Sequence, residues 1–331
     1  MLEPLLFNSK IDLKFDRENL AKLSKYFDLD FLDSSFDEKI LFFNNLQQLS
    51  QRSLGLAHNI QHHSTSIVSV QLCSSSAIKD RVLSHSYGQL IGCSSQVKQS
   101  DRITLIDNTL NGEKRWLSNL DLADYAIIQI ESNGQPYIVY VDLHKVPHKV
   151  DFSFFTPIGM EMSKPGNLIF DNQPIDPECI LGVKGTQPFF QQSNFASQCF
   201  LTNHFGLTKQ LFLDIKQYAE QNKCGAEFEI AKLEIDVCTL EMMWHDNLYT
   251  INETVLTNEF WNKRNTQYAF SKKTLINVIK LILELGVSYY TDAHSEFSQR
   301  FRDAITYASH MHPLYRFGQE FYMLDLDHSR G

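Results

Sequence analysis

The chain lacks the sequence features of several protein classes. Its six cysteines include no Cys-x-x-Cys pair, which favours buried free thiols over a redox motif or a disulfide framework. No run of about 18 uncharged apolar residues is present, so no membrane span is predicted. The first residues lack the basic stretch and the long apolar run of a secretory signal. We therefore expect a cytoplasmic protein.

Basic charge is also scarce. Lys and Arg total 30 against 39 Asp and Glu, which gives a formal net charge of −9. No Lys/Arg-rich run offsets this balance, so nucleic acid is not an expected partner. The remaining composition is ordinary for a globular protein, with 43% hydrophobic and 21% charged residues among 331. A chain of this length can bury a core in one large or two to three smaller units.

The pattern of apolar residues changes twice along the chain. Residues 1–87 favour helices, residues 88–185 contain short β-rich runs between turns, and residues 186–331 favour helices again. This order predicts an α+β fold with an N-terminal helical domain, a central antiparallel β-domain and a C-terminal helical domain. Ser and Asp residues at 33–38 predict a helix start. Further helices are expected at 53–74, 76–86, 200–223, 228–249, 257–285 and 288–310.

Residues 111–125 are the most informative segment. Asn111-Gly112 predicts a turn, and the residues after it suit a strand that carries Trp116 and Ser118. An indole beside a hydroxyl group offers a flat redox-active ring one packing surface and one hydrogen bond. A Trp in a strand is also typical of a plain core, so this pattern alone leaves both interpretations open.

The sequence Asn-Gly-Glu-Lys-Arg-Trp-Leu-Ser-Asn at 111–119, followed by Ala-Asp-Tyr at 123–125, resembles the β-domain motif of the acyl-CoA dehydrogenase superfamily. Segments 87–93, 157–160, 168–172, 284–286 and 300–304 extend the likeness over roughly residues 50 to 315. The resemblance implies this family's fold and a flavin, with FAD expected and FMN possible. Trp116 would flank the flavin ring, and Ser118 would hydrogen-bond its N5 atom.

Other positions depart from the family pattern. The first strand of the family's β-domain carries a hydroxyl residue followed by an acid. In this chain, counting from the turn that enters the strand places these two positions at Val97 and Lys98. A register shifted by two residues places the hydroxyl position at Ser95 instead. Cys93 begins the same stretch. A cofactor-binding Arg of the family is missing, and Lys223 is the substitute that the resemblance offers, as a less directional donor.

The family's catalytic carboxylate is also missing. Its two usual positions fall on Met311 and Ala196, and neither side chain can accept a proton. His310 stands beside one of them, at a spacing that resembles the flavin-dependent monooxygenase branch of the superfamily. His310 is therefore the candidate catalytic residue. Ser100 and Met311 are candidates for substrate contact.

Three histidines lie close together in the expected second helix. His58 and His62 are four residues apart, a spacing that can hold a metal, and His63 follows directly. No acidic partner accompanies them, so no metal site is predicted, and a polar helix face near the cleft is the preferred interpretation.

Three functions remain open. The first is an FAD-dependent oxidoreductase that oxidises a CH–CH bond of an acyl thioester, and the second is a reduced-flavin monooxygenase. The third is a diverged scaffold without catalysis. The resemblance also implies a small-molecule substrate, an electron-transfer or reductase partner, and a homodimer or homotetramer.

Overall fold

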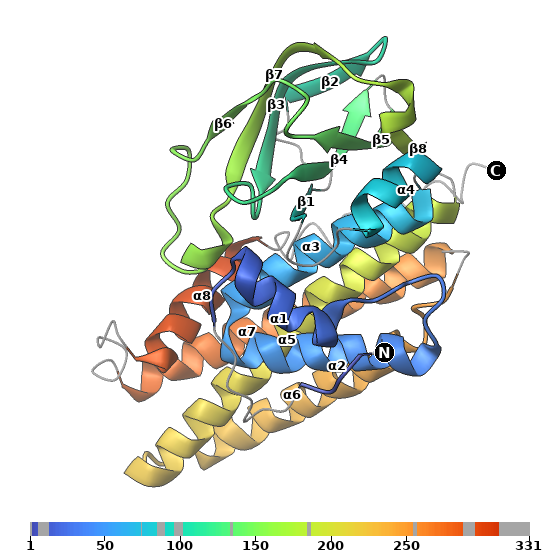
Figure 1. Ribbon diagram of the computed structural model, residues 1–331. Helices are drawn as coiled ribbons and strands as arrows, with labels where there is room; N and C mark the ends of the chain where they lie inside the picture. The colour runs from blue at the N-terminus through green and yellow to red at the C-terminus, as the bar shows by residue number, and fades with distance from the viewer. Residues whose placement is uncertain are drawn as a thin grey trace, which may run out of the picture.

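The structure is a computed structural model of the whole chain. It describes residues 2–5, 13–73, 75–84, 90–95, 102–132, 135–183, 187–253, 257–286 and 295–310. Helices occupy both ends of the sequence and strands lie between them, as the sequence predicts (Figure 1). No described helix is long and apolar enough to cross a membrane.

Among the described residues, four helices precede the strands. They are α1 (Arg17–Phe27), α2 (Phe36–Arg52), α3 (Leu54–Cys73) and α4 (Ser76–Leu83). Helix α2 begins where the sequence predicts a helix start, because Ser35 accepts from the Glu38 N–H while the Glu38 carboxylate accepts from the Ser35 N–H. Phenylalanines of α2 pack with residues of α1, α3 and α5 in one apolar cluster.

In the described part of the chain, eight strands form two four-stranded sheets. The first has the order β1-β4-β5-β8 and the second β2-β3-β7-β6. All pairs are antiparallel except β1 with β4, which is parallel. An apolar core containing residues of both sheets holds the β unit together. The strands are β1 (Gly92–Ser95), β2 (Arg102–Ile106), β3 (Thr109–Leu117), β4 (Tyr125–Ser132), β5 (Gln135–Asp142), β6 (Lys149–Asp151), β7 (Gly166–Pro174) and β8 (Ile180–Val183).

The predicted turn at Asn111-Gly112 is wrong. The tight turn between β2 and β3 lies at Asp107 and Asn108, which both have positive φ. Gly112 sits inside β3, opposite Ile103, where an added Cβ would lie 1.9 Å from a backbone oxygen of β2. Gly112 therefore permits close pairing of the two strands, and the Asp-Asn pair makes the turn.

Four further helices follow the strands: α5 (Gln187–Asn222), α6 (Glu227–Leu248), α7 (Asn258–Leu285) and α8 (Glu296–His310). Helix α5 begins at Gln187 rather than at the predicted residue 200. The helical turns before residue 200 are stabilised because Phe189, Phe195 and Cys199 are buried against other elements.

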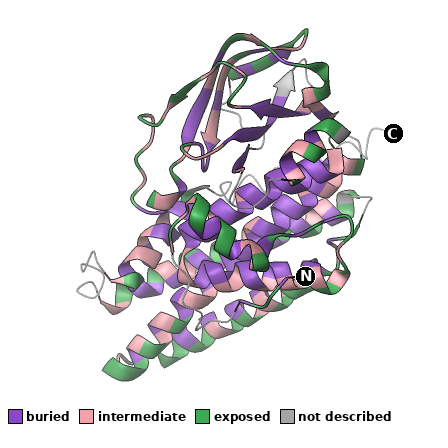
Figure 2. Ribbon diagram, in the orientation of Figure 1, coloured by how far each residue is buried: buried purple, intermediate pink, exposed green. Residues whose placement is uncertain are grey.

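The β unit lies over one side of the helices, with β1 above α3 (Figure 1). Most of α3 is buried, because the β unit covers one side of it and α2 and α5 cover others (Figure 2). Helix α3 contains no Asp, Glu, Lys or Arg, as expected of a helix enclosed on nearly all sides. This sandwiched helix and the strand ends above it position the candidate site.

Candidate functional site

Trp116 lies at an irregularity in strand β3. The pairing of β3 with β7 changes register between Lys114 and Leu117, and Trp116 has a positive φ of 64°. A left-handed conformation is costly for a bulky aromatic residue, and an irregularity of this kind re-aims a side chain. The half-buried indole packs edge-on against Phe154 and Phe155, with ring centroids 4.9 and 4.8 Å away.

Two histidines of α3 connect Ser118 with strand β1. His58 Nε2 lies 3.1 Å from Ser118 Oγ and 3.1 Å from His62 Nε2. His62 Nδ1 lies 2.8 Å from the carbonyl oxygen and 3.0 Å from the hydroxyl oxygen of Ser94. Both serines are buried, whereas both histidines are half-buried in a stretch of otherwise buried helix. The site therefore joins α3, β1 and the end of β3.

Strand β1 runs very close to α3. The Gly92 N–H donates to His63 Nδ1 over 3.1 Å, and burial lowers the pKa of His63 to about 4, so the ring remains a neutral acceptor. A Cβ at Gly92 would lie 1.9 Å from Ser66 Oγ and 2.5 Å from the Tyr125 ring. Glycine therefore permits this approach, which brings Ser94, two residues later, to His62.

Helix α8 borders the same histidines. Tyr307 packs edge-on against the His58 ring at 5.8 Å and stacks on Phe200 at 4.9 Å. One turn earlier, the Asp303 carboxylate accepts from the Met160 N–H over 2.5 Å. Segments 157–160 and 300–304, which were singled out separately in the sequence, therefore lie against each other.

Of the predicted cofactor residues, Trp116 and Ser118 lie at this site. Cys93 does not, because it packs in the apolar core of the β unit with its side chain fully buried. Ser95 is the last residue of β1, and the structure describes only its backbone. Ser94, which the sequence reasoning missed, is the hydroxyl residue of β1 that contacts His62. Successive side chains of a strand point to opposite faces, so Ser94 and Cys93 lie on different faces of β1. This alternation is the sequence signal that could have identified Ser94.

Several predicted residues cannot be placed beside Ser118. Val97, Ser100 and Met311 lie outside the described residues. His310 is the last residue of α8, and its side chain lies outside the description as well. Ala196, one of the two carboxylate positions, is buried in α5. Their roles stay predictions.

Lys223 lies far along α5 from the site. It is exposed, follows the last residue of α5 and has a φ of 50°. Asn203 of α5 donates to Gln61 of α3 over 2.8 Å, so Asn203 marks the part of α5 that lies beside the site. The helix from Asn203 to Lys223 spans about 30 Å at roughly 1.5 Å per residue. Lys223 therefore does not reach a group at Ser118 of the same chain.

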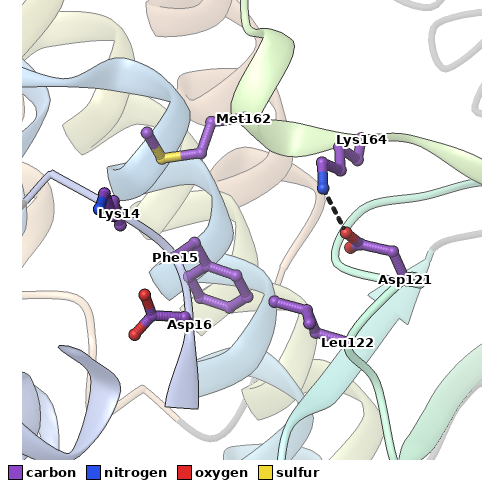
Figure 3. Close-up of a pocket in the computed structure, with 7 residues that line it drawn as sticks. All are labelled: Lys14, Phe15, Asp16, Asp121, Leu122, Met162 and Lys164. Atoms are coloured by element: carbon purple, nitrogen blue, oxygen red, sulfur yellow. Dashed lines mark hydrogen bonds and ion pairs between the residues drawn. The ribbon is translucent and has the colours of Figure 1, made fainter. Parts of the chain in front are cut away.

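Two cavities border the short helix η1 (Glu161–Ser163). One of about 270 Å³ lies where the segment before α1 meets the β unit, and an ion pair of 2.8 Å between Lys164 and Asp121 stands at its edge (Figure 3). The other, of about 500 Å³, lies between the start of α3, η1 and α8. Gly55, one turn before His58, and Asp303 are among its lining residues. Among the described residues, no three metal-ligating side chains cluster.

The chain matches no protein-family model and no curated protein. Solved structures do match it. Butyryl-CoA dehydrogenase from Megasphaera elsdenii gives a TM-score of 0.77 at 14% identity, over 93% of this chain and 89% of that one. A glutaryl-CoA dehydrogenase from Mycobacterium smegmatis in complex with FADH2 gives 0.76 at 12%, over 92% and 85%. The dibenzothiophene monooxygenase TdsC from Paenibacillus sp. A11-2, with FMN and indole, gives 0.72 at 14%, over 94% and 89%.

These superpositions extend over nearly the whole chain, although identity is low. They confirm, for the fold, the resemblance that the segment around Trp116 indicates, including the order of helices, strands and helices. The chain has the acyl-CoA dehydrogenase fold.

Proposed function

We propose that this protein is a flavin-dependent oxidoreductase that oxidises a CH–CH bond of an acyl thioester without the usual catalytic carboxylate. The proposal rests on one observation: Trp116 and Ser118 both lie at the end of β3, beside two half-buried histidines. When bound, the flavin would supply the hydride acceptor for this oxidation.

The residues present fit the flavin ring. A half-buried indole offers apolar surface to a flat ring. The Ser118 hydroxyl has one proton and two lone pairs, and its contact with His58 uses one of these. If His58 donates to Ser118, the hydroxyl proton is available to a ring nitrogen. Two proteins of the same fold were solved with FADH2 and with FMN.

We propose FAD as the cofactor, with FMN as the alternative. Whether FAD or FMN binds depends on contacts to the part of FAD beyond the ring. Lys223 is the candidate for such a contact. Because Lys223 lies about 30 Å along α5 from the level of the site, only a second copy of the chain would bring it to the cofactor. FAD binding and self-association are therefore linked in this proposal.

An exposed apolar stripe on α6 supports self-association as a homodimer or homotetramer. Phe228, Ile235, Met242 and Tyr249 are 66 to 73% exposed and seven residues apart. Three further exposed residues, Ala231, Cys238 and His245, lie between them, so the stripe alternates steps of three and four. This is the spacing of a helix that packs along a second helix, and a two-fold pair would place the stripe on itself.

The substrate and partners follow from the same proposal. The cavity of about 500 Å³ near the start of α3 has the volume of a small-ligand site. We propose that it receives part of an acyl thioester, and that an electron-transfer or reductase partner exchanges electrons with the flavin. A cytoplasmic location is part of the proposal.

The absorbance of the purified protein between about 300 and 550 nm tests the flavin assignment. We expect bands that stay with the protein through desalting after incubation with FAD, and weaker retention with FMN. Trp116→Leu should weaken flavin binding about fivefold, because it removes an aromatic contact worth roughly 1 kcal/mol beyond its area. Trp261→Phe on α7 is the matched control. If neither flavin binds in its oxidised or reduced form, the enzyme proposal fails and a non-catalytic scaffold remains.

A reduced-flavin monooxygenase is the second candidate. Ser118 contacts His58, which in turn contacts His62. Activation of oxygen by a reduced flavin does not require the carboxylate that acyl thioester oxidation does. Flavin reduction by acyl thioesters under anaerobic conditions would support the first candidate. Substrate oxygenation that requires both externally reduced flavin and O2 would support the second.

A further inference from the structure

The contact between His62 and strand β1 fixes which nitrogen of His62 carries a proton. His62 Nδ1 lies 2.8 Å from the carbonyl oxygen of Ser94, and a carbonyl oxygen only accepts hydrogen bonds. Nδ1 must therefore be the protonated nitrogen. In the neutral ring, Nε2 is then bare and basic. A backbone acceptor that orients the ring in this way is the usual arrangement for a histidine that works through its Nε2.

The proton on His58 follows from this assignment. The two Nε2 atoms are 3.1 Å apart, so one of them must donate. Because Nε2 of neutral His62 is bare, His58 carries its proton on Nε2. That N–H has a second acceptor at the same distance, Ser118 Oγ at 3.1 Å. The N–H of His58 can therefore donate to His62 Nε2 or to Ser118 Oγ.

Three titratable groups, His63, His204 and Tyr307, lie around this arrangement. His63 follows His62 on α3, and burial lowers its pKa to about 4. His204 on α5 packs against Tyr307, and burial lowers its pKa to about 3. Tyr307 on α8 contacts His58, and burial raises its pKa well above the usual value. These three neighbours are neutral at neutral pH and do not compete with His62 for a proton.

We propose that His62 is the general base of this protein, in place of the absent carboxylate. The inference rests on the proposed function. The Ser94 carbonyl fixes the His62 tautomer, and His58 is a positioning residue that links His62 to the Ser118 hydroxyl. Ser118 accepts from His58, so its own proton would be available to a nitrogen of the flavin ring.

The location of His62 suits the chemistry of the proposed oxidation. The two C–H bonds that break are on adjacent carbons, so the base must lie within a few ångströms of the hydride acceptor. The contacts from Ser118 Oγ to His58 Nε2 and from there to His62 Nε2 are each 3.1 Å. In the step, the α C–H bond breaks and its proton goes to His62 Nε2. A bound flavin would supply the acceptor for the hydride of the β C–H bond, and the carbon–carbon double bond would form.

Exchange of the α-hydrogen tests the base without requiring hydride transfer. 3,3-Dimethylbutanoyl-CoA has hydrogens on its α-carbon and none on its β-carbon, so it can lose a proton to a base but no hydride. We expect the flavin-loaded full-length protein to exchange these α-hydrogens for deuterium in D2O, followed by proton NMR. His62→Gln should slow the exchange at least about 100-fold, the lower range of a general base's contribution. His148→Gln, between β5 and β6 and in contact with the Val146 carbonyl oxygen, should leave it unchanged.

A second measurement is independent of flavin and substrate. In histidine-selective 15N NMR of the protein without cofactor, His62 should be protonated on Nδ1 and bare on Nε2 near neutral pH, with its signals assigned by their loss in His62→Gln. His58→Gln removes the linking ring and should slow exchange less than His62→Gln does. This variant also keeps the test decisive if His62→Gln does not fold.

The outcomes separate the two proposals. If flavin binds but His62→Gln, or both histidine variants, exchange at the wild-type rate, the base assignment is overturned and the proposed function stands. Absence of exchange in flavin-loaded wild-type protein overturns the assignment as well, as does His62 protonated on Nε2. If the protein retains no flavin, the proposed function fails, and the His62 tautomer alone still decides whether the α3–β1 contact is as described.

Discussion

Asp303 has a buried carboxyl group, and its surroundings disfavour the charged form. Only 3% of the residue is exposed, and this burial raises the pKa of Asp303 to about 6. Hydrogen bonds from the Met160 N–H and from Gln299, together with the charge of Arg302, lower the pKa, but by less than burial raises it. The carboxylate fixes the loop before η1 to α8, so its ionisation bears on the packing around the larger cavity.

The raised pKa of Asp303 predicts a specific loss of stability with pH. The folded state holds the proton more tightly than the unfolded chain, whose Asp pKa is 3.8. The stabilisation is complete below that value and is lost as the pH rises through about 6. In Asp303→Asn this dependence should vanish. The free energy of unfolding of the variant, relative to wild type, should rise by about 2 to 3 kcal/mol between roughly pH 4 and 7, since one pKa unit corresponds to about 1.4 kcal/mol.

Urea unfolding of both proteins across this pH range measures the difference. Asn retains a side-chain oxygen that can accept from the Met160 N–H, so the variant changes charge more than shape. Parallel stability curves for the two proteins would show that the Asp303 carboxyl group is not perturbed in this way.

At the scale of elements, helices α2 and α5 approach closely at Gly206. A Cβ on Gly206 would lie 1.9 Å from Ser50 Oγ and 2.5 Å from the backbone oxygen of Gln47. The second of these contacts involves backbone and cannot be relieved by a side-chain rotation. Gly206 therefore sets the distance between the two helices that carry much of the apolar cluster below the site.

Gly206→Ala should lower the free energy of unfolding by about 2 kcal/mol. Overpacking costs roughly 1 to 3 kcal/mol, and a Cβ only 2.5 Å from a backbone oxygen places Gly206→Ala at the upper end of this range. The gain of about 1 kcal/mol from replacing a helical glycine by alanine offsets only part of that cost. Gly55→Ala in α3 is the matched control, because its nearest contact would be the Met162 Cβ at 3.1 Å. Its effect should stay within about 1 kcal/mol. Equal melting temperatures for Gly206→Ala and wild type would contradict the close approach.

At the scale of the whole molecule, the stripe on α6 is the surface that we assign to a second copy. Ile235 lies near its middle and is 67% exposed. Lys232, over the Phe228 ring, and Asp246, near the other end of the helix, lie on the same flank. An antiparallel pair would therefore bring each Lys232 toward the partner's Asp246, which favours an antiparallel arrangement over a parallel one.

Ile235→Lys should convert the oligomer into a monomer in size-exclusion chromatography with light scattering. The new charge would be placed in the centre of an apolar contact, where burial without a partner is costly. Glu229→Lys, one residue beyond Phe228 and off the stripe, should leave the mass unchanged. Loss of FAD retention together with the loss of mass would support the link between Lys223 and a second copy. A wild-type monomer would rule out the assignment of this surface.

The sequence by itself determined the order of elements and the main motif. Apolar periodicity of 3.6 and of 2 residues is local, so it indicates helices, then strands, then helices without knowledge of contacts. The start of α2 was predictable because the Ser35 and Glu38 cap forms within four residues. The Trp116 and Ser118 strand and the absence of acids at Ala196 and Met311 could also be read directly.

Only the tertiary structure decided which side chains meet. His62 contacts Ser94 across 32 positions and His58 contacts Ser118 across 60, so both contacts depend on how β1 and β3 dock on α3. No local pattern encodes that docking. That Ser94 contacts His62 while Cys93 packs in the core of the β unit followed from the register of β1 against β4 and from the close passage that Gly92 permits. Local patterns therefore predict elements and motifs, whereas the register of packed elements decides which residues form the site.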